Sequence, residues 1–253
     1  MTCPVSYIMK KMKEYDAYLF DLYGTLVDIH TDEDRPAFWK KLCDVFFHYG
    51  IRYEWRGLKE RYFEEVRIRE AQEQIPGHEI EIDLKDVFRK LCGDLSDEDV
   101  TEVMTQFRIL STSHLRLYAG VKELLSFLRE NGKKAILVSN AQEVFTMKEL
   151  EDLGILSLFD EIVISSAVGF RKPDPKIYET ALQRSGLPAE KCLMIGNDPI
   201  CDVKGAVNAG IDAYYIRSAL SPKIENTEKT VGLQERMDLR LLKRRIERSM
   251  KNQ

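Results

Sequence analysis

Residues 18–26 read Tyr18-Leu19-Phe20-Asp21-Leu22-Tyr23-Gly24-Thr25-Leu26, a short apolar strand followed abruptly by an acid, a glycine and a hydroxyl. An aspartate at the end of a buried strand lies at the carboxyl edge of a sheet, where open α/β sheets bind their ligands. A glycine at position 24 allows the backbone to turn sharply there. We therefore expect the Asp21 carboxylate to act as a nucleophile, as a metal ligand, or as both.

Beyond residue 117, apolar strands and amphipathic helices alternate along the chain. Each predicted helix closes at or near a glycine, and each strand is a continuous apolar run of the kind buried on both faces. The predicted helices are 121–130, 142–153, 175–185 and 202–209, and the predicted strands are 135–138, 161–164, 192–195 and 213–216. This alternation predicts an α/β fold built on a doubly wound parallel sheet.

Between the first strand and residue 113 the pattern is helical instead. Glycines and a proline divide it into four segments, with breaks at Gly50, at Ile75-Pro76-Gly77 and at Gly93. Ser96 and Asp99 are spaced as a capping box for the fourth helix. Four helices with short joints suggest a small bundle. We therefore predict a core formed by residues 1–32 and 114–253, with a helical cap at 33–113.

Polar side chains follow four of the predicted strands. The first strand ends at Asp21, and the second runs into Ser139 and Asn140. Lys172 follows the third, and Gly196-Asn197-Asp198-Pro199-Ile200-Cys201-Asp202 follows the fourth. Because the carboxyl ends of parallel strands meet at one edge of a sheet, these groups are expected to converge.

The converging groups suit the transfer of a group to a carboxylate. Asp21 would attack and form a covalent aspartyl intermediate. Thr25 and Ser139, with nearby backbone amides, would hold the oxygens of the group being transferred. Lys172 supplies a compact positive charge that would orient Asp21. A set of hard oxygens suited to Mg²⁺ is also expected, formed by Asp21, Asp198, Asp202 and the backbone carbonyl of Tyr23.

In order and spacing these motifs resemble those of the haloacid dehalogenase superfamily of hydrolases, over about residues 18–217. The first motif of that family reads Asp-x-Asp-x-Thr, and here Asp21 and Thr25 match it while Tyr23 replaces the second aspartate. The resemblance implies a Rossmann-like core, a cap that closes over the site, and catalytic roles for Asp21, Tyr23, Thr25, Ser139, Asn140 and Lys172.

Tyr23 leaves the reaction type open. The second aspartate is the general acid and base of the family's phosphatases, and replacing such a group typically costs ~10²–10⁴-fold in rate. A tyrosine, with a reference pKa near ~10, is a donor and a poor base at neutral pH. The 2-haloacid dehalogenases of the family carry this Asp-x-Tyr-Gly-Thr pattern. Departing halide needs no proton, so the missing acid costs these enzymes nothing. Arg52, Arg56 and Arg61 are the candidates for the arginine that those enzymes place beside the halide.

The segment 196–202 favours a different conclusion, because its two acids resemble the family's metal-binding motif. We therefore favour a Mg²⁺-dependent phosphatase acting on a small phosphorylated metabolite through an aspartyl-phosphate. The alternatives are a metal-independent 2-haloacid dehalogenase that forms an aspartyl ester and, third, a non-catalytic binding module. Whether Asn197 or Asp198 is the metal ligand stays open, because many relatives carry an acid where Asn197 stands.

Composition limits the partners and the location of the protein. The formal net charge is -4, from 38 Lys+Arg against 42 Asp+Glu, which gives no reason to expect a nucleic acid or an anionic membrane as partner. The longest apolar runs are shorter than the ~20 residues of a membrane span. The five cysteines are scattered, which favours a reducing cytoplasm; they are Cys3, Cys43, Cys92, Cys192 and Cys201. We expect a small-molecule substrate, and either a monomer or a homodimer.

Overall fold

A six-stranded parallel sheet forms the centre of the molecule. The computed structural model describes residues 12–224, 228 and 230–251. The strand order is β5-β4-β1-β6-β7-β8, so the strand that ends before Asp21 lies between β4 and β6. The strands are β1 (Ala17–Phe20), β4 (Lys134–Ser139), β5 (Glu161–Ile164), β6 (Cys192–Gly196), β7 (Asp212–Ile216) and β8 (Gly232–Gln234). The predicted parallel, doubly wound sheet is confirmed, and β8 is an addition to it.

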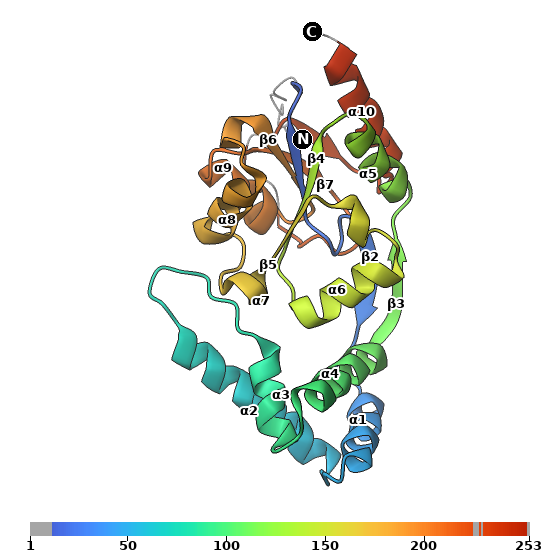
Figure 1. Cartoon of the computed structure of the whole chain (residues 1–253), viewed down its shortest axis with the longest axis vertical. Helices are drawn as coiled ribbons and strands as arrows, with labels where there is room; N and C mark the ends of the chain where they lie inside the picture. Colours follow the sequence, from blue (N-terminus) through green and yellow to red (C-terminus); the bar gives the residue numbers. More distant parts are fainter. Residues whose placement is uncertain (1–11, 225–227, 229, 252–253) are drawn as a thin grey trace, which may run out of the picture.

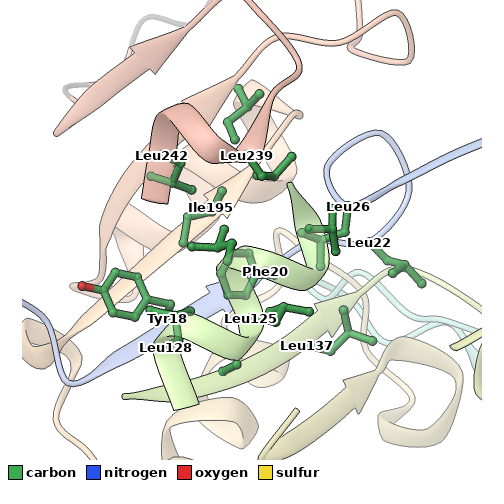
Figure 2. Packing of buried hydrophobic residues seen from close by; sticks show 14 of the residues in the cluster. Tyr18, Phe20, Leu22, Leu26, Leu125, Leu128, Leu137, Ile195, Leu239 and Leu242 are labelled. Atoms are coloured by element: carbon green, nitrogen blue, oxygen red, sulfur yellow. The ribbon is translucent and has the colours of Figure 1, made fainter. Parts of the chain in front are cut away.

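Helices cover both faces of the sheet, as Figure 1 shows. Alternate side chains of β1 enter two different clusters. Tyr18 and Phe20 pack with Leu125 and Leu242 from α5 and α10 (Figure 2). Ala17 and Leu19 pack on the other side, against α8 and α9. The helices of the core are α5 (Val121–Glu130), α6 (Glu143–Asp152), α7 (Ser165–Val168), α8 (Pro175–Ser185), α9 (Gly205–Asn208) and α10 (Leu239–Lys251).

Short helical turns complete the core. They are η1 (Leu156–Leu158), η2 (Ala189–Lys191) and η3 (Pro199–Lys204), of which the last is a π-helical turn. The helix predicted at 202–209 therefore begins earlier than expected and starts as a wider turn. Asp198 precedes this turn and accepts hydrogen bonds from its first N–H groups, which explains the early start.

An antiparallel ribbon leads from the core to the cap. It pairs β2 (Val27–Thr31) with β3 (Thr112–Leu117), so that Val27 lies opposite Leu117 and Ile29 opposite Leu115. The expectation of helix from the first motif to residue 113 is wrong for these two segments. The partner strands are about 85 residues apart in sequence, so the pairing that stabilises each strand cannot be seen in its local pattern.

Four helices form the cap, and it has its own aromatic cluster. The helices are α1 (Pro36–His48), α2 (Trp55–Glu73), α3 (Leu84–Cys92) and α4 (Asp97–Ser111). The Ser96 hydroxyl accepts the Asp99 N–H at 3.1 Å, as the capping-box spacing predicts. The loop before α3 reaches the core, where Glu81 N donates to Gly169 O (3.1 Å) and Arg171 N donates to Glu79 O (2.9 Å). This contact places the cap over the carboxyl edge of the sheet, while the predicted boundaries at 33 and 113 stay a prediction.

In the described part of the chain, no helix is both long enough and apolar enough to cross a membrane. The cysteines that the structure describes are free thiols: Cys43, Cys92, Cys192 and Cys201. Cys3 lies outside the described residues.

Phe46 and Phe47 test whether the cap has a core of its own. The Phe46 side chain is 0% exposed in the cap cluster, whereas Phe47 is 59% exposed. We expect Phe46→Ala to lower the free energy of unfolding by about 3–5 kcal/mol, because the cavity left behind cannot fully collapse. Phe47→Ala should lower the free energy of unfolding by no more than about 1 kcal/mol, because it removes only the stacking of the ring with Arg52. Urea denaturation measures both, and equal losses would contradict the assignment.

Candidate active site

Asp21 begins the loop that follows the central strand. Its backbone N–H donates to Ile195 O at 3.0 Å, and the loop closes when the N–H groups of residues 25–27 turn back onto Leu22 O. Gly24 sits in this turn with φ +86°, and a Cβ there would lie 2.4 Å from the Asn197 amide nitrogen. Glycine is therefore required twice, once by the backbone conformation and once by the approach of Asn197.

The Lys172 ammonium lies next to Asp21 and is only 2% exposed. It donates to Asp21 Oδ1 (2.8 Å), to Asp202 Oδ1 (2.7 Å) and to the carbonyl oxygen of Val138 (2.8 Å). Burial alone would lower the pKa of Lys172, but the carboxylates of Asp202 and Asp21 raise it above its usual value. The group therefore stays charged and balances two buried acids.

Asn140 positions Lys172 from the end of the neighbouring strand. Its side-chain amide donates to Lys172 O at 2.9 Å and accepts the Lys172 N–H at 2.7 Å. This reciprocal pair fixes the backbone of the residue that holds Asp21. Asn140 thus lies within the predicted site and contacts it through the backbone of Lys172.

Two hydroxyls lie at the same edge. Thr25 Oγ1 donates to Asp21 Oδ2 at 3.0 Å. Ser139 Oγ is fully buried and has no hydrogen-bond partner in the described structure. A buried hydroxyl without a partner costs roughly 1–3 kcal/mol, so it is a group that a ligand could satisfy.

The two acids after β6 differ in how they relate to Asp21: Asp202 shares the Lys172 ammonium with it, whereas Asp198 caps the turn that follows. Asp198 Oδ1 accepts the N–H groups of Ile200 (2.7 Å) and Cys201 (2.8 Å). Asp202 Oδ1 binds Lys172, and its Oδ2 accepts Asp198 N at 2.9 Å. Within the described ranges, no three His, Cys, Asp or Glu side chains are grouped so that they could hold a metal ion. The turn engages Asp198 and Lys172 engages Asp202, and the predicted metal set of Asp21, Asp198, Asp202 and the Tyr23 carbonyl stays a prediction.

Asn197 faces Asp21 instead. One end of its amide lies 3.2 Å from Asp21 Oδ2, 3.2 Å from Thr25 Oγ1 and 3.3 Å from the Tyr23 carbonyl oxygen. The other end lies 3.3 Å from Ser218 Oγ. The amide can turn either its oxygen or its nitrogen toward Asp21, and the two ends have opposite hydrogen-bonding character.

The Tyr23 side chain is directed at α6. Its hydroxyl donates to Glu149 Oε2 at 2.5 Å, and Glu149 Oε1 also accepts from Arg108 Nε at 2.6 Å. The Arg108 guanidinium lies 5.5 Å from the Tyr23 ring centroid. Burial, and then the charge of Glu149, raise the pKa of the Tyr23 hydroxyl well above its usual value. Tyr23 is therefore a neutral phenol whose proton is committed to Glu149.

Arg108 and Glu149 were not expected from the sequence. They lie on the cap helix α4 and the core helix α6, 41 positions apart, and no local pattern joins them. The arginines considered from the sequence lie elsewhere: Arg52 stacks on Phe47, Arg56 stacks on Trp55, and Arg61 donates to Lys90 O. None of these three candidates for the arginine beside the halide lines the cavity next to Tyr23, whereas Arg108 does.

A cavity of about 460 Å³ lies between the cap and this edge of the sheet. Tyr23, Asn140 and Gln142 line it from the core, and α2 and α4 line it from the cap. Its size is within the range of small-molecule sites, which is ~300–1,000 Å³. Two of the lining residues, Tyr23 and Asn140, belong to the segments that carry Asp21 and the unpartnered Ser139 hydroxyl, so a substrate-sized space adjoins these segments.

Comparison with known proteins gives the family. Residues 15–210 match the family model described as haloacid dehalogenase-like hydrolase. The chain belongs to this family. The fold is similar to that of a known structure. A HAD phosphatase from Thermococcus onnurineus superposes on this chain with a TM-score of 0.58 at 22% identity, covering 92% of this chain and 97% of the other.

Curated relatives of this hydrolase carry two kinds of name. Glyceraldehyde 3-phosphate phosphatases are 37% identical over 42% of this chain in Methanothermobacter thermautotrophicus and 32% identical over 64% in Methanopyrus kandleri. The matched part spans about half (47%) of the first relative and 70% of the second. An (S)-2-haloacid dehalogenase from a Pseudomonas species is 28% identical over 78% of this chain and 80% of its own length.

Lys172→Met tests the charge balance of this hydrolase's site. Leaving buried acids without their cation should cost about 3–5 kcal/mol of unfolding free energy at pH 7. Because protonation of one acid relieves the repulsion, the deficit should shrink as the pH falls toward about 5. Lys176→Met, whose side chain is 50% exposed, is the matched control in urea denaturation. A deficit equal to that of the control, or independent of pH, would be the contrary result.

Proposed function

We propose that this hydrolase is a Mg²⁺-dependent phosphatase acting on a small phosphorylated metabolite, with Asp21 as the nucleophile. The observation that carries the proposal is the Asp21 carboxylate itself, which Lys172 holds through Oδ1, at the same sheet edge as the unpartnered Ser139 hydroxyl. The names of the archaeal relatives support phosphate as the group transferred.

Each residue then has a part in phosphoryl transfer. A carboxylate oxygen of Asp21 attacks phosphorus, the bond from phosphorus to the leaving oxygen breaks, and that oxygen departs with the electron pair. Lys172 holds Asp21 and offsets negative charge, while Thr25 and Ser139 donate hydrogen bonds to phosphoryl oxygens. Water then cleaves the aspartyl-phosphate and restores Asp21.

The donors around Asn197 fit a hard cation with one carboxylate. With its oxygen inward, the amide faces Asp21 Oδ2 and the Tyr23 carbonyl at 3.2 and 3.3 Å, and proton-free oxygens so close are stabilised by a cation between them. We propose that Asp21, Tyr23 O and Asn197 hold Mg²⁺. Asp198 and Asp202 would act one layer further out, by fixing the turn and Lys172. When bound, Mg²⁺ would neutralise charge on the phosphoryl oxygens.

Tyr23 limits the leaving group. The Tyr23 hydroxyl donates its proton to Glu149, so it is not free to protonate the leaving oxygen, and a tyrosinate would have no proton to give. We therefore expect substrates whose leaving group needs no proton, such as aryl or acyl phosphates, to react faster than alkyl phosphates.

The dehalogenase alternative is favoured by the same two residues. Departing halide needs no acid, which suits Tyr23. With its nitrogen inward, the Asn197 amide would donate to Asp21 Oδ2 and to the Tyr23 carbonyl, so the site could do without a metal. The Pseudomonas relative gives this alternative a precedent.

The remaining expectations belong to the same proposal. We propose a small-molecule substrate, and a cytoplasmic location on the ground that the described cysteines are free thiols. We also propose that the protein acts as a monomer or a homodimer.

Phosphate release from p-nitrophenyl phosphate separates the alternatives. We expect turnover by the wild type that needs Mg²⁺ and falls by at least ~10³-fold in Asp21→Asn, because an amide is a poor nucleophile. Absence of turnover, with halide released from 2-chloropropionate in the presence of a chelator, would establish the dehalogenase instead. Absence of both activities, with Mg²⁺ still bound, would indicate a binding module.

A pair of substitutions identifies the metal ligand. Asn197→Asp adds a second carboxylate to the proposed set and should lower the Mg²⁺ concentration for half-maximal activity by about tenfold. Asp198→Asn keeps a side chain that caps the turn and should leave that concentration unchanged. Titration of activity with Mg²⁺ measures both, and the opposite pattern would assign the ligand to Asp198.

A further inference from the structure

Aromatic rings dominate the cavity beside the site. Five of its lining residues are aromatic, and they come from the catalytic loop, α2, α4 and α6: Tyr23, Tyr62, Phe63, Phe107 and Phe145. We infer that this cavity selects substrates whose leaving group carries a planar, uncharged aromatic ring. The inference rests on the proposed function, because the leaving group is the part that would enter the cavity.

Most of these rings are fixed before a substrate arrives. Tyr62, Phe107 and Phe145 are at most 8% exposed. The Tyr62 and Phe107 centroids lie 5.3 Å apart, and the Phe107 and Phe145 rings lie nearly parallel, with centroids 6.5 Å apart. A wall of packed rings offers stacking and edge contacts without losing side-chain entropy on binding.

Phe63 is the exception and faces the cavity from α2. It is 40% exposed, although it contacts Tyr62 and Trp39. An exposed phenylalanine beside a cavity gains from covering its ring with an apolar group. A flat apolar leaving group would bury the exposed face of the Phe63 ring, whereas a polar leaving group would leave that face in contact with water.

The charges around the cavity disfavour a second anionic group. Among the described residues that line it, Arg108 is the only basic one, and Glu149 already neutralises it. Glu33 and Asp34 add carboxylates to the same lining, and Lys59, which lies near Phe63, is paired with Asp34 at 3.2 Å. A carboxylate on the leaving group would therefore meet like charges and no unpaired cation.

Two alkyl phosphates separate binding from reactivity. Benzyl phosphate and n-butyl phosphate release primary alcohols, so neither has the activated leaving group of an aryl phosphate, and they differ in the ring. We expect kcat/KM to be about tenfold higher for benzyl phosphate than for n-butyl phosphate, because its KM is lower. A 4-carboxyl group on the benzyl ring should remove this advantage. Equal KM values for benzyl and butyl, or tighter binding of the carboxylated ester, would overturn the inference while leaving the phosphatase intact.

Matched variants locate the effect. Phe63→Leu keeps most of the volume and removes the ring, so the preference for benzyl phosphate should fall by about fivefold. Phe47→Leu, an exposed ring on α1 outside the cavity lining, should leave it unchanged. Equal effects of the two variants would place the selection elsewhere and overturn the inference.

A binding measurement keeps the inference independent of turnover. Benzylphosphonate and butylphosphonate, which are not hydrolysed, can be titrated into Asp21→Asn by calorimetry. We expect the benzyl compound to bind about tenfold more tightly. If it does so while the wild type hydrolyses no phosphate ester, the proposed function fails and the aromatic selectivity stands; equal binding of the two phosphonates overturns the selectivity.

Discussion

The buried ammonium of Lys172 is the interaction on which the site depends. It joins the ends of three neighbouring strands, because its hydrogen bonds go to Asp21 after β1, to Val138 O within β4 and to Asp202 after β6. Without it, two carboxylates would be buried close together, which is strongly unfavourable. The cation therefore holds Asp21 in place through a hydrogen bond to Oδ1, and Asn140 holds the backbone of Lys172. The geometry of the whole carboxyl edge follows from this one charge.

A second network ties the cap to the catalytic loop. Arg108 from α4 and Glu149 from α6 form an ion pair with little exposure to solvent, and the Tyr23 hydroxyl adds a third member. Tyr23 thereby joins the cap and the core. The same residue contributes its ring to the cavity wall, so the hydrogen-bond network and the shape of the cavity are linked through one side chain.

The sheet could be predicted because its signals are local. Strand Glu161–Ile164 and helices Val121–Glu130 and Pro175–Ser185 have the predicted bounds, since each has a continuous pattern and a clear end. The ribbon β2–β3 could not, because each strand is stabilised by a partner far away in sequence. The role of Asp198 as the cap of the π-helical turn was beyond the sequence for a related reason, because the sequence pattern predicted an ordinary helix from residue 202.

The sequence by itself determined the parallel core, the helical cap, the acid at the end of the central strand and the glycine that lets the chain turn there. These depend on backbone preferences and on the periodicity of burial, which neighbouring residues carry. Only the tertiary structure decided which polar groups face Asp21, that Tyr23 bonds to Glu149, and that Arg108 reaches the cavity. The physical reason is that a buried polar side chain turns toward whichever partner satisfies it, and those partners, on other strands and on the cap, are brought near only by folding.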